Sequence, residues 1–223
     1  MTFSLVARCA KTGMFGMAIS SSSPAVAARC AHTRSGIGAV ASQNVTDPDL
    51  GPKLLDLLEK GLSAAEAIAI VTASTPYIEY RQLLVVDNLG RTAIHSGTQV
   101  LGLWGAAQSE NVAAGGNLLA NNTIPQVLVD TFLATQGHLA DRLLAAMKAG
   151  KAAGGEAGPL HSAGLKVVDR QSWPIVDLRS DWSETPIEDI DIAWEIYKPQ
   201  IAAYVQRAEN PTQAPSYGVP GDL

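Results

Sequence analysis

The 223-residue sequence lacks the features that mark several common classes of protein. It has no run of lysine and arginine, and its formal net charge is −5, so it offers no basic stripe to neutralise nucleic-acid phosphates. No stretch of about 18 apolar residues predicts a membrane-spanning helix. The N-terminus shows no basic region followed by an apolar run, as a signal peptide would. We therefore expect a cytoplasmic protein that binds neither nucleic acid nor membrane.

Cysteine is also scarce, and familiar motifs for metals and phosphates are missing. The two cysteines, Cys9 and Cys30, have no C-x-x-C spacing and no clustered histidines, so we predict reduced, packed thiols and no metal site. The sequence contains no GxxxxGK[ST] phosphate loop, no HExxH helix and no GxSxG elbow. No cofactor is expected from these patterns.

The composition that remains is globular, with 47% hydrophobic and 17% charged residues. Such a chain can bury a sizeable core. Aromatic residues make up only 5%, so alanine, valine, leucine and isoleucine must do most of the packing.

Strand and helix patterns arrive in blocks along the chain. The predicted order is a hairpin, a strand, two helices, a hairpin, a strand, two helices, a hairpin and a final helix. These elements cover residues 2–7, 15–20, 36–43, 52–60, 63–74, 82–86, 91–96, 111–115, 124–135, 139–149, 163–168, 175–178 and a helix from residue 185. Hairpins imply antiparallel pairing, and block order favours the α+β class. Two sheets between two helical layers would use these elements well.

Local signals support several boundaries. The run from Ser63 to Glu66 is a capping box, and Asp87-Asn88-Leu89-Gly90 is a hairpin turn. Pro199 predicts a kink or a break in the last helix. Prolines and glycines after Glu209 argue against a packed element there. We therefore predict one domain over residues 1–208 and a tail over residues 209–223, placed on the surface or on a partner subunit.

The feature with the clearest chemical meaning is Thr2, which begins the first strand. Initiator methionine is usually removed when the second residue is small. Removal of Met1 would give Thr2 a free α-amine, with a reference pKa near ~8, beside its own hydroxyl. That amine can act as general base for the hydroxyl, directly or through one water. Many proteins begin Met-Thr, however, and threonine suits a strand without any catalytic role.

A resemblance over about residues 2–170 gives Thr2 more weight. The segments that carry it are MTFSLVARCAKTGMFGMAISSSS, GIGAVASQNVTDPDLGPKLLDLLEKGLSAAEA, Tyr80-Arg81-Gln82, VVDNLGR over residues 85–91, GGNLLA over residues 115–120, and His161-Ser162-Ala163. In this order they resemble a bacterial and archaeal family labelled a domain of unknown function and placed in the N-terminal-nucleophile hydrolase superfamily. The resemblance implies a four-layer αββα sandwich of two antiparallel sheets. By analogy with the superfamily, it implies hydrolysis of a C–N bond, although a fold does not fix a function.

The resemblance also implies a set of site residues. Thr2 would be the nucleophile, with Ser21 and Asn117 as further catalytic residues. Asn117 could donate to an oxyanion, or could be an ordinary turn residue. Arg81 could bind a substrate carboxylate with two hydrogen bonds, or could form a surface ion pair. The predicted substrate-binding residues are Ser22, Gln43, Arg81, Gln82 and His161.

The cation that would activate the threonine is not evident in the sequence. Lys53, Arg29, His32 and Arg34 are the candidates, and the sequence does not distinguish among them. His95 is interpreted as a structural histidine on a strand.

Three functional hypotheses follow. The leading one is an enzyme that hydrolyses an amide or related C–N bond of a small molecule through an acyl-enzyme on Thr2. The second is a non-catalytic protein that binds a small ligand on the same fold. The third is a hydrolase or deaminase that activates water without an N-terminal nucleophile, using Ser21, Ser22 or His161. A homodimer is also expected, on general grounds.

Overall fold

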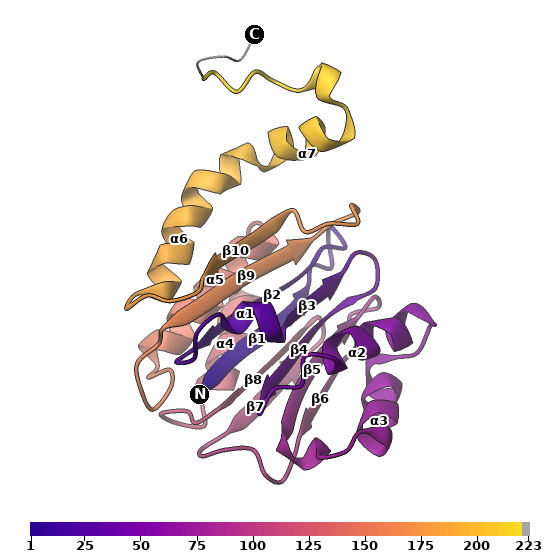
Figure 1. Cartoon of the computed structure of the whole chain (residues 1–223), viewed down its shortest axis with the longest axis vertical. Helices are drawn as coiled ribbons and strands as arrows, with labels where there is room; N and C mark the ends of the chain where they lie inside the picture. Colours follow the sequence, from indigo (N-terminus) through magenta and orange to yellow (C-terminus); the bar gives the residue numbers. More distant parts are fainter. Residues whose placement is uncertain (220–223) are drawn as a thin grey trace.

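Two antiparallel β-sheets lie at the centre of the computed structural model, which describes residues 1–219 (Figure 1). The larger sheet has the strand order β10-β9-β2-β1-β8-β7, and the smaller has the order β3-β4-β5-β6. The strands are β1 (Thr2–Arg8), β2 (Phe15–Ser21), β3 (Ala31–Arg34), β4 (Gly38–Asn44), β5 (Arg81–Asp87), β6 (Thr92–Ser96), β7 (Gly105–Ser109), β8 (Val112–Asn117), β9 (Ser162–Val168) and β10 (Val176–Ser180).

Helices cover the outer faces of both sheets. Two helices, α4 and α5, pack on the larger sheet, and two others, α2 and α3, pack on the smaller sheet. The helices are α1 (Val26–Cys30), α2 (Leu50–Glu59), α3 (Ala64–Ser74), α4 (Ile124–Ala134), α5 (Leu139–Ala152), α6 (Pro186–Tyr197) and α7 (Ile201–Glu209), with short 3₁₀ turns η1 (Ile78–Tyr80), η2 (Lys198–Gln200) and η3 (Pro211–Gln213). The predicted α+β class with two antiparallel sheets is confirmed.

Three apolar clusters fill the spaces between these layers. One joins α4 and α5 to the larger sheet, a second lies between the sheets, and a third joins α2 and α3 to the smaller sheet. Strand β1 contributes to two of them, because successive side chains on a strand point to opposite faces. Phe3 and Leu5 pack toward the helices, whereas Val6 packs between the sheets. Thr2 and Ser4 share the face of Val6 and therefore point between the sheets.

The predicted helix cap, hairpin turn and helix break are all present in the structure. Ser63 caps α3 with the reciprocal hydrogen bonds of a capping box, and the turn at residues 87–90 joins β5 to β6. Pro199 lies in the 3₁₀ turn η2 between α6 and α7, so the predicted break in the last helix is confirmed.

Two strands and one short helix differ from the sequence prediction. Helix α1 and strand β3 fill residues 26–34, which the sequence analysis left without elements. Strand β7 is also additional, and its sequence GAAQS has the low β propensity of glycine and alanine. It forms because β8 offers a free edge, with Gly105 opposite Gly116 and Ser109 opposite Val112.

Helix α6 packs on β9 and β10 of the larger sheet, and α7 with residues 210–219 extends beyond the sandwich as an arm (Figure 1). Near its end the guanidinium of Arg207 lies 3.7 Å from the ring centroid of Tyr217 and donates to the Pro215 carbonyl at 2.9 Å. The last part of the predicted tail, residues 220–223, lies outside the described residues.

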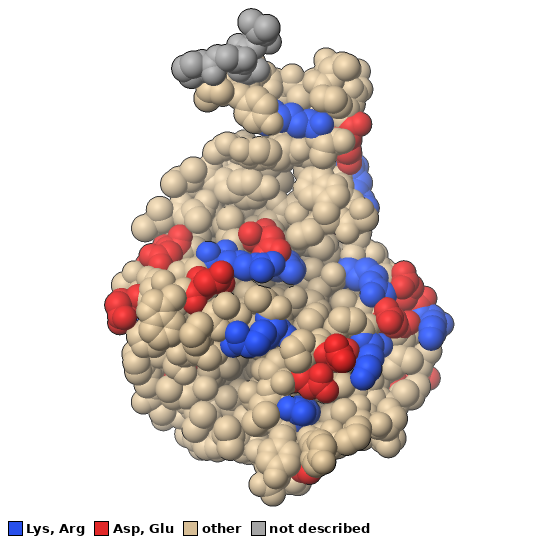
Figure 2. Space-filling model, in the orientation of Figure 1, with Lys and Arg blue, Asp and Glu red and all other residues tan. Residues whose placement is uncertain are grey.

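Figure 2 shows the charges on one face of the described part. On the face shown in Figure 2, basic and acidic side chains alternate instead of forming a patch of one sign. Within residues 1–219, no helix is both long and apolar enough to cross a membrane.

Candidate functional site

Three predicted catalytic residues lie in one row across the larger sheet. Thr2 on β1 is paired with Ser21 on β2 on one side and with Asn117 on β8 on the other. All three are almost fully buried. Side chains two residues apart on a strand share a face, and Val6 on β1 belongs to the core between the sheets. The row therefore points into the space between the two sheets, at one end of the sandwich.

A chain of hydroxyl groups surrounds Thr2. The Thr2 Oγ1 atom lies 3.2 Å from Ser21 Oγ, which lies 2.9 Å from Ser23 Oγ. The guanidinium of Arg29, on α1, donates to Ser23 Oγ at 3.1 Å. The positive charge of Arg29 is thus linked to Thr2 through two serine hydroxyls. Thr2, Ser21, Ser23 and Asn117 are called the N-terminal cluster below.

Asn117 carries an unused hydrogen-bond donor. Its Nδ2 atom is buried and has no hydrogen-bond partner among the described residues. Buried polar atoms in native proteins are nearly always paired, so such an atom calls for an explanation. Gly116 precedes Asn117, and a Cβ at Gly116 would lie 3.0 Å from the Thr2 carbonyl oxygen. The glycine therefore lets β8 lie close to β1 and brings the amide beside Thr2.

Met1 occupies the space in front of the cluster. Its carbonyl oxygen accepts hydrogen bonds from Ser21 Oγ and from Thr2 Oγ1, each at 2.5 Å. Its side chain lies over Gly158, where a Cβ would be 2.7 Å from Met1 Cε and 3.3 Å from Met1 Sδ. Met1 therefore fills the entrance to Thr2.

Glu156 is the residue at this site that the sequence analysis missed. It lies in the loop after α5 and is only 5% exposed. Its Oε2 atom accepts from the Ser22 backbone N–H at 3.1 Å, and its Oε1 atom is buried with no hydrogen-bond partner within residues 1–219. Burial raises the pKa of Glu156 to about 8, while the nearby positive charge of the amino terminus acts in the opposite direction. Its flanking glycines were the only signal in the sequence.

The predicted residues Gln43 and Gln82 lie deeper in the space between the sheets. Ser4 Oγ donates to Gln43 Oε1 at 2.6 Å, and Gln43 Nε2 donates to Gln82 Oε1 at 2.8 Å. Gln82 Nε2 in turn donates to Ser96 Oγ at 3.1 Å. Ser4, Gln43 and Gln82 are fully buried, and their polar chain joins β1 to the smaller sheet, two residues along from Thr2.

Arg81 is not brought together with Thr2. Because neighbours on a strand point to opposite faces, Gln82 points between the sheets and Arg81 points toward the layer of α2 and α3. Arg81 donates to the Val45 carbonyl and lines a cavity of about 400 Å³ together with Asp47, Lys53 and Tyr77. Its surroundings are thus separate from the N-terminal cluster.

Ser22 and His161 lie at the rim of the cluster. Ser22 holds Glu156 through its backbone N–H, as described above. The His161 backbone N–H donates to the Ser21 carbonyl at 2.9 Å. The His161 ring stacks on Trp182 with ring centroids 4.4 Å apart, and its Nδ1 atom lies 3.6 Å from a Glu184 carboxylate oxygen. The backbone of His161 is therefore at the site, while its ring contacts Trp182, Glu184 and the Ser183 carbonyl.

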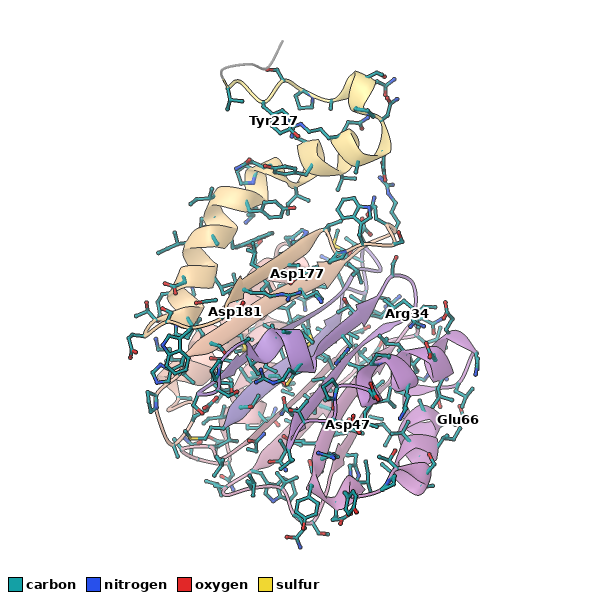
Figure 3. All side chains as sticks on the ribbon, viewed as in Figure 1. Arg34, Asp47, Glu66, Asp177, Asp181 and Tyr217 are labelled. Carbon is teal, nitrogen blue, oxygen red and sulfur yellow. The ribbon has the colours of Figure 1, made fainter. Side chains whose placement is uncertain are left out.

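Of the four candidate cations, Arg29 is the one joined to Thr2 by the hydroxyl chain. His32 bonds to the Arg29 carbonyl at 3.3 Å, and Lys53 lines the cavity of Arg81. Arg34 forms ion pairs with Asp56 and Glu59 of α2, on the side of the molecule seen in Figure 3. The His95 Nε2 atom donates to the Ile78 carbonyl, 3.1 Å away, as a structural histidine would.

Other parts of the described chain offer cavities but less chemistry. A cavity of about 450 Å³ lies between α7 and the loop that joins β9 to β10, and it is lined partly by Ile175, Ile201 and Val205. No group of three or more histidine, cysteine, aspartate or glutamate side chains within residues 1–219 is arranged to bind a metal ion. We therefore take the N-terminal cluster as the candidate active site, since it alone combines a hydroxyl nucleophile, an unpaired amide donor and a buried carboxyl among the sites described above.

Comparison with known proteins places the chain in a family. Residues 2–190 match the model of a family of unknown function, DUF1028. The chain belongs to this family. Its structure is similar to the crystal structure of protein SPO2555 from Silicibacter pomeroyi, described with the same family model. The TM-score is 0.82 at 28% identity, covering 88% of this chain and 89% of the other.

A second solved structure is more distant. It is Anbu, an ancestral β-subunit, from Yersinia bercovieri, with a TM-score of 0.41 at 11% identity, covering 92% of this chain and 97% of the other. No curated protein matches the sequence.

Proposed function

We propose that this DUF1028 protein is an N-terminal-nucleophile hydrolase of the αββα type, which cleaves a C–N bond of a small molecule through Thr2. The observation that carries the proposal is the row of Thr2, Ser21 and Asn117, in which the threonine hydroxyl lies beside a serine hydroxyl and opposite an unpaired amide donor. Removal of Met1 would both free the α-amine and open the space in front of Thr2.

The chemistry follows from these groups. The Thr2 α-amine accepts the hydroxyl proton as Oγ1 attacks the substrate carbonyl carbon. The carbonyl oxygen takes the negative charge and is stabilised by donation from Asn117 Nδ2 and Ser21 Oγ. The C–N bond breaks, the leaving nitrogen takes the proton from the α-amine, and an acyl ester remains on Oγ1. A water molecule then hydrolyses the ester and regenerates the hydroxyl.

The electrostatic support for this step comes from Arg29. A positive charge linked to Thr2 through Ser23 and Ser21 favours the neutral amine and the ionised hydroxyl over their protonated forms. Arg29 would thus be the activating cation, which the sequence alone did not distinguish among its four candidates.

The test uses protein whose N-terminal mass has been measured. Loss of Met1, turnover of members of a panel of small amides, and loss of turnover in Thr2→Ala are the expected results, with Thr2→Ser retaining part of the activity. Full activity in Thr2→Ala on a substrate that the wild type cleaves would refute the nucleophile. A stable Met1 in active protein would do the same.

Glu156 favours a second candidate, a hydrolase or deaminase that activates water without an N-terminal nucleophile. A buried carboxyl with a pKa of about 8 is well suited to exchange a proton near neutral pH. Chemical blocking of the α-amine separates the two candidates. Activity that survives blocking supports water activation, whereas the threonine mechanism loses it. Ligand binding without turnover in either form would instead support the non-catalytic alternative.

A further inference from the structure

Met1 shows how the site holds an acyl group. Chemically, Met1 is an α-aminoacyl group attached to the Thr2 nitrogen, and its three parts lie toward different residues. The carbonyl oxygen accepts from Ser21 Oγ and Thr2 Oγ1, the thioether chain lies over Gly158, and the α-ammonium lies near Glu156.

The position of Met1 is close to that of a substrate acyl group. The nitrogen and Oγ1 of a threonine can both bond to one carbonyl carbon, since the ring that this forms has five members. Thr2 Oγ1 already lies 2.5 Å from the Met1 carbonyl oxygen. An acyl group carried on Thr2 Oγ1 would therefore lie in the space that Met1 fills, and its carbonyl oxygen would accept from Ser21 Oγ as that of Met1 does.

Glu156 fits the ammonium of such a group. Its Oε2 atom is held by the Ser22 N–H, which leaves the buried Oε1 atom without a partner among the residues described. A buried carboxylate is costly unless an opposite charge accompanies it. A nearby ammonium favours the ionised form of this carboxyl, since the positive charge of the Met1 α-amine lowers the pKa of Glu156, although burial has the larger effect and raises it.

Gly158 leaves room for the side chain of the acyl group. The space that a Cβ would need at residue 158 is taken by the last two heavy atoms of the Met1 side chain. This glycine does not adopt the positive φ angles that larger residues avoid, so its lack of a side chain serves to leave room. A linear apolar chain of about the length of methionine matches the space.

We infer that, after Met1 is removed, the site takes α-aminoacyl amides that carry a free α-ammonium, held by Glu156, and an unbranched apolar side chain, held over Gly158. This inference rests on the proposed function and names its substrate class. In the reaction, Thr2 Oγ1 forms an ester with the aminoacyl carbon as the C–N bond breaks and the amine leaves with a proton. Water then releases the free amino acid and restores the hydroxyl.

Three chromogenic substrates test the inference on full-length protein that lacks Met1. They are the p-nitroanilides of L-methionine, L-leucine and N-acetyl-L-methionine. The free methionyl compound is expected to have the highest kcat/KM, and acetylation of its amine is expected to lower kcat/KM by roughly 10- to 100-fold, the range for losing a charge-assisted hydrogen bond.

Glu156→Gln separates recognition of the ammonium from folding. This variant is expected to raise the KM of the free methionyl compound by roughly tenfold or more and to remove most of its advantage over the acetylated one. Glu195→Gln, which changes an exposed carboxylate on α6, is the matched control and is expected to keep the preference. An undiminished preference in folded Glu156→Gln would overturn the assignment of Glu156.

Gly158→Ala tests the side-chain space. An added Cβ is expected to lower kcat/KM for the methionyl compound by roughly tenfold while sparing L-alanine p-nitroanilide, since one methyl group in a tight pocket changes selectivity by about that factor. Equal losses on both compounds would overturn the placement of the side chain over Gly158.

The substrate class can fail while the proposed function stands. Faster cleavage of the acetylated than of the free methionyl compound, with loss of both in Thr2→Ala, would overturn the inference and keep the nucleophile. So would a lack of turnover of all the anilides in protein whose Thr2 takes a hydroxylamine-labile acetyl group from p-nitrophenyl acetate. Absence of that acetyl group would count against Thr2 as nucleophile.

Discussion

Thr2 and Asn117 lie directly opposite each other across the β1–β8 pairing, and the Asn117 amide nitrogen is the buried donor left unpaired beside the threonine. In the proposed reaction this donor is used when the oxyanion forms. Asn117→Ala is therefore expected to lower kcat by roughly 10²- to 10³-fold with a small change in KM, as loss of one oxyanion donor does. Steady-state kinetics on a substrate that the wild type cleaves provides the measurement.

Asn88→Ala is the matched control for that experiment. Asn88 lies exposed in the turn between β5 and β6, far along the chain from Thr2 and outside the N-terminal cluster. It is expected to have wild-type kinetics. If Asn117→Ala raised KM and left kcat unchanged, the amide would contact the substrate in its ground state instead of stabilising the oxyanion.

The N-terminal row could largely be predicted from the sequence. Thr2 and Ser21 end adjacent strands of an N-terminal hairpin, and Asn117 ends a third strand after two glycines. The grouping itself comes from the family resemblance, and the strand limits agree with it, because an antiparallel sheet brings such ends together. The pairing of Thr2 with both partners depends on β1 lying between β2 and β8, and the strand order became known only from the structure.

Arg81 and Glu156 show where sequence reasoning stopped. The resemblance groups Arg81 with Gln82 as one Arg-Gln pair. Adjacent residues on a strand point to opposite faces, however, and the two side chains lie in different layers. Glu156 lies in an irregular loop with no periodicity to predict its direction. Its burial follows from the packing of that loop against Leu118 and Leu119, including the Ala157 N–H to Leu118 carbonyl bond of 2.9 Å.

Asp141 links three elements and offers a test of the fold. It donates no proton itself but accepts from the His138 N–H, from Trp194 Nε1 at 2.7 Å and from Lys198 Nζ at 2.8 Å. Asp141→Ala is expected to lower the free energy of unfolding by about 2 kcal/mol, because it removes a helix cap and leaves the buried Trp194 donor unpaired. Urea unfolding followed by tryptophan fluorescence measures this change.

Asp130→Ala provides the comparison for Asp141. Asp130 is exposed on α4 and accepts from Gln126 one turn earlier. Its substitution is expected to change the free energy of unfolding by less than about 0.5 kcal/mol. Equal effects of the two substitutions would mean that the Asp141 contacts do not stabilise the junction between α5 and α6.

Asp141 also predicts a dependence on pH. Burial raises the pKa of Asp141, but the hydrogen bonds from Lys198 and Trp194 together lower it by more. The pKa in the folded state therefore lies below the ordinary value of 3.8. A lowered carboxyl pKa adds stability above the unfolded pKa and loses it as the pH falls through the folded pKa. The difference in stability between wild type and Asp141→Asn is therefore expected to shrink below about pH 4, as urea midpoints at several pH values would show.

Glu156 predicts the opposite dependence on pH. Its pKa in the folded state is about 8, against 4.5 as the ordinary value, so between these pH values the folded chain holds a proton that the unfolded chain has lost. Stability therefore falls as the pH rises through this window and levels off above pH 8. With each pKa unit equivalent to about 1.4 kcal/mol, the loss between pH 5 and pH 8 is on the order of 4 kcal/mol. Glu156→Gln, which cannot ionise, is expected to lack this slope.

The charged group that faces Glu156 is the α-amine of Met1, so the slope should differ between protein with and without Met1. Thermal unfolding at half-unit pH intervals, on samples whose N-terminal mass is known, measures all three profiles. Parallel profiles for wild type and Glu156→Gln would show that the carboxyl stays ionised in the folded state, and its buried Oε1 atom would then require a permanent positive partner.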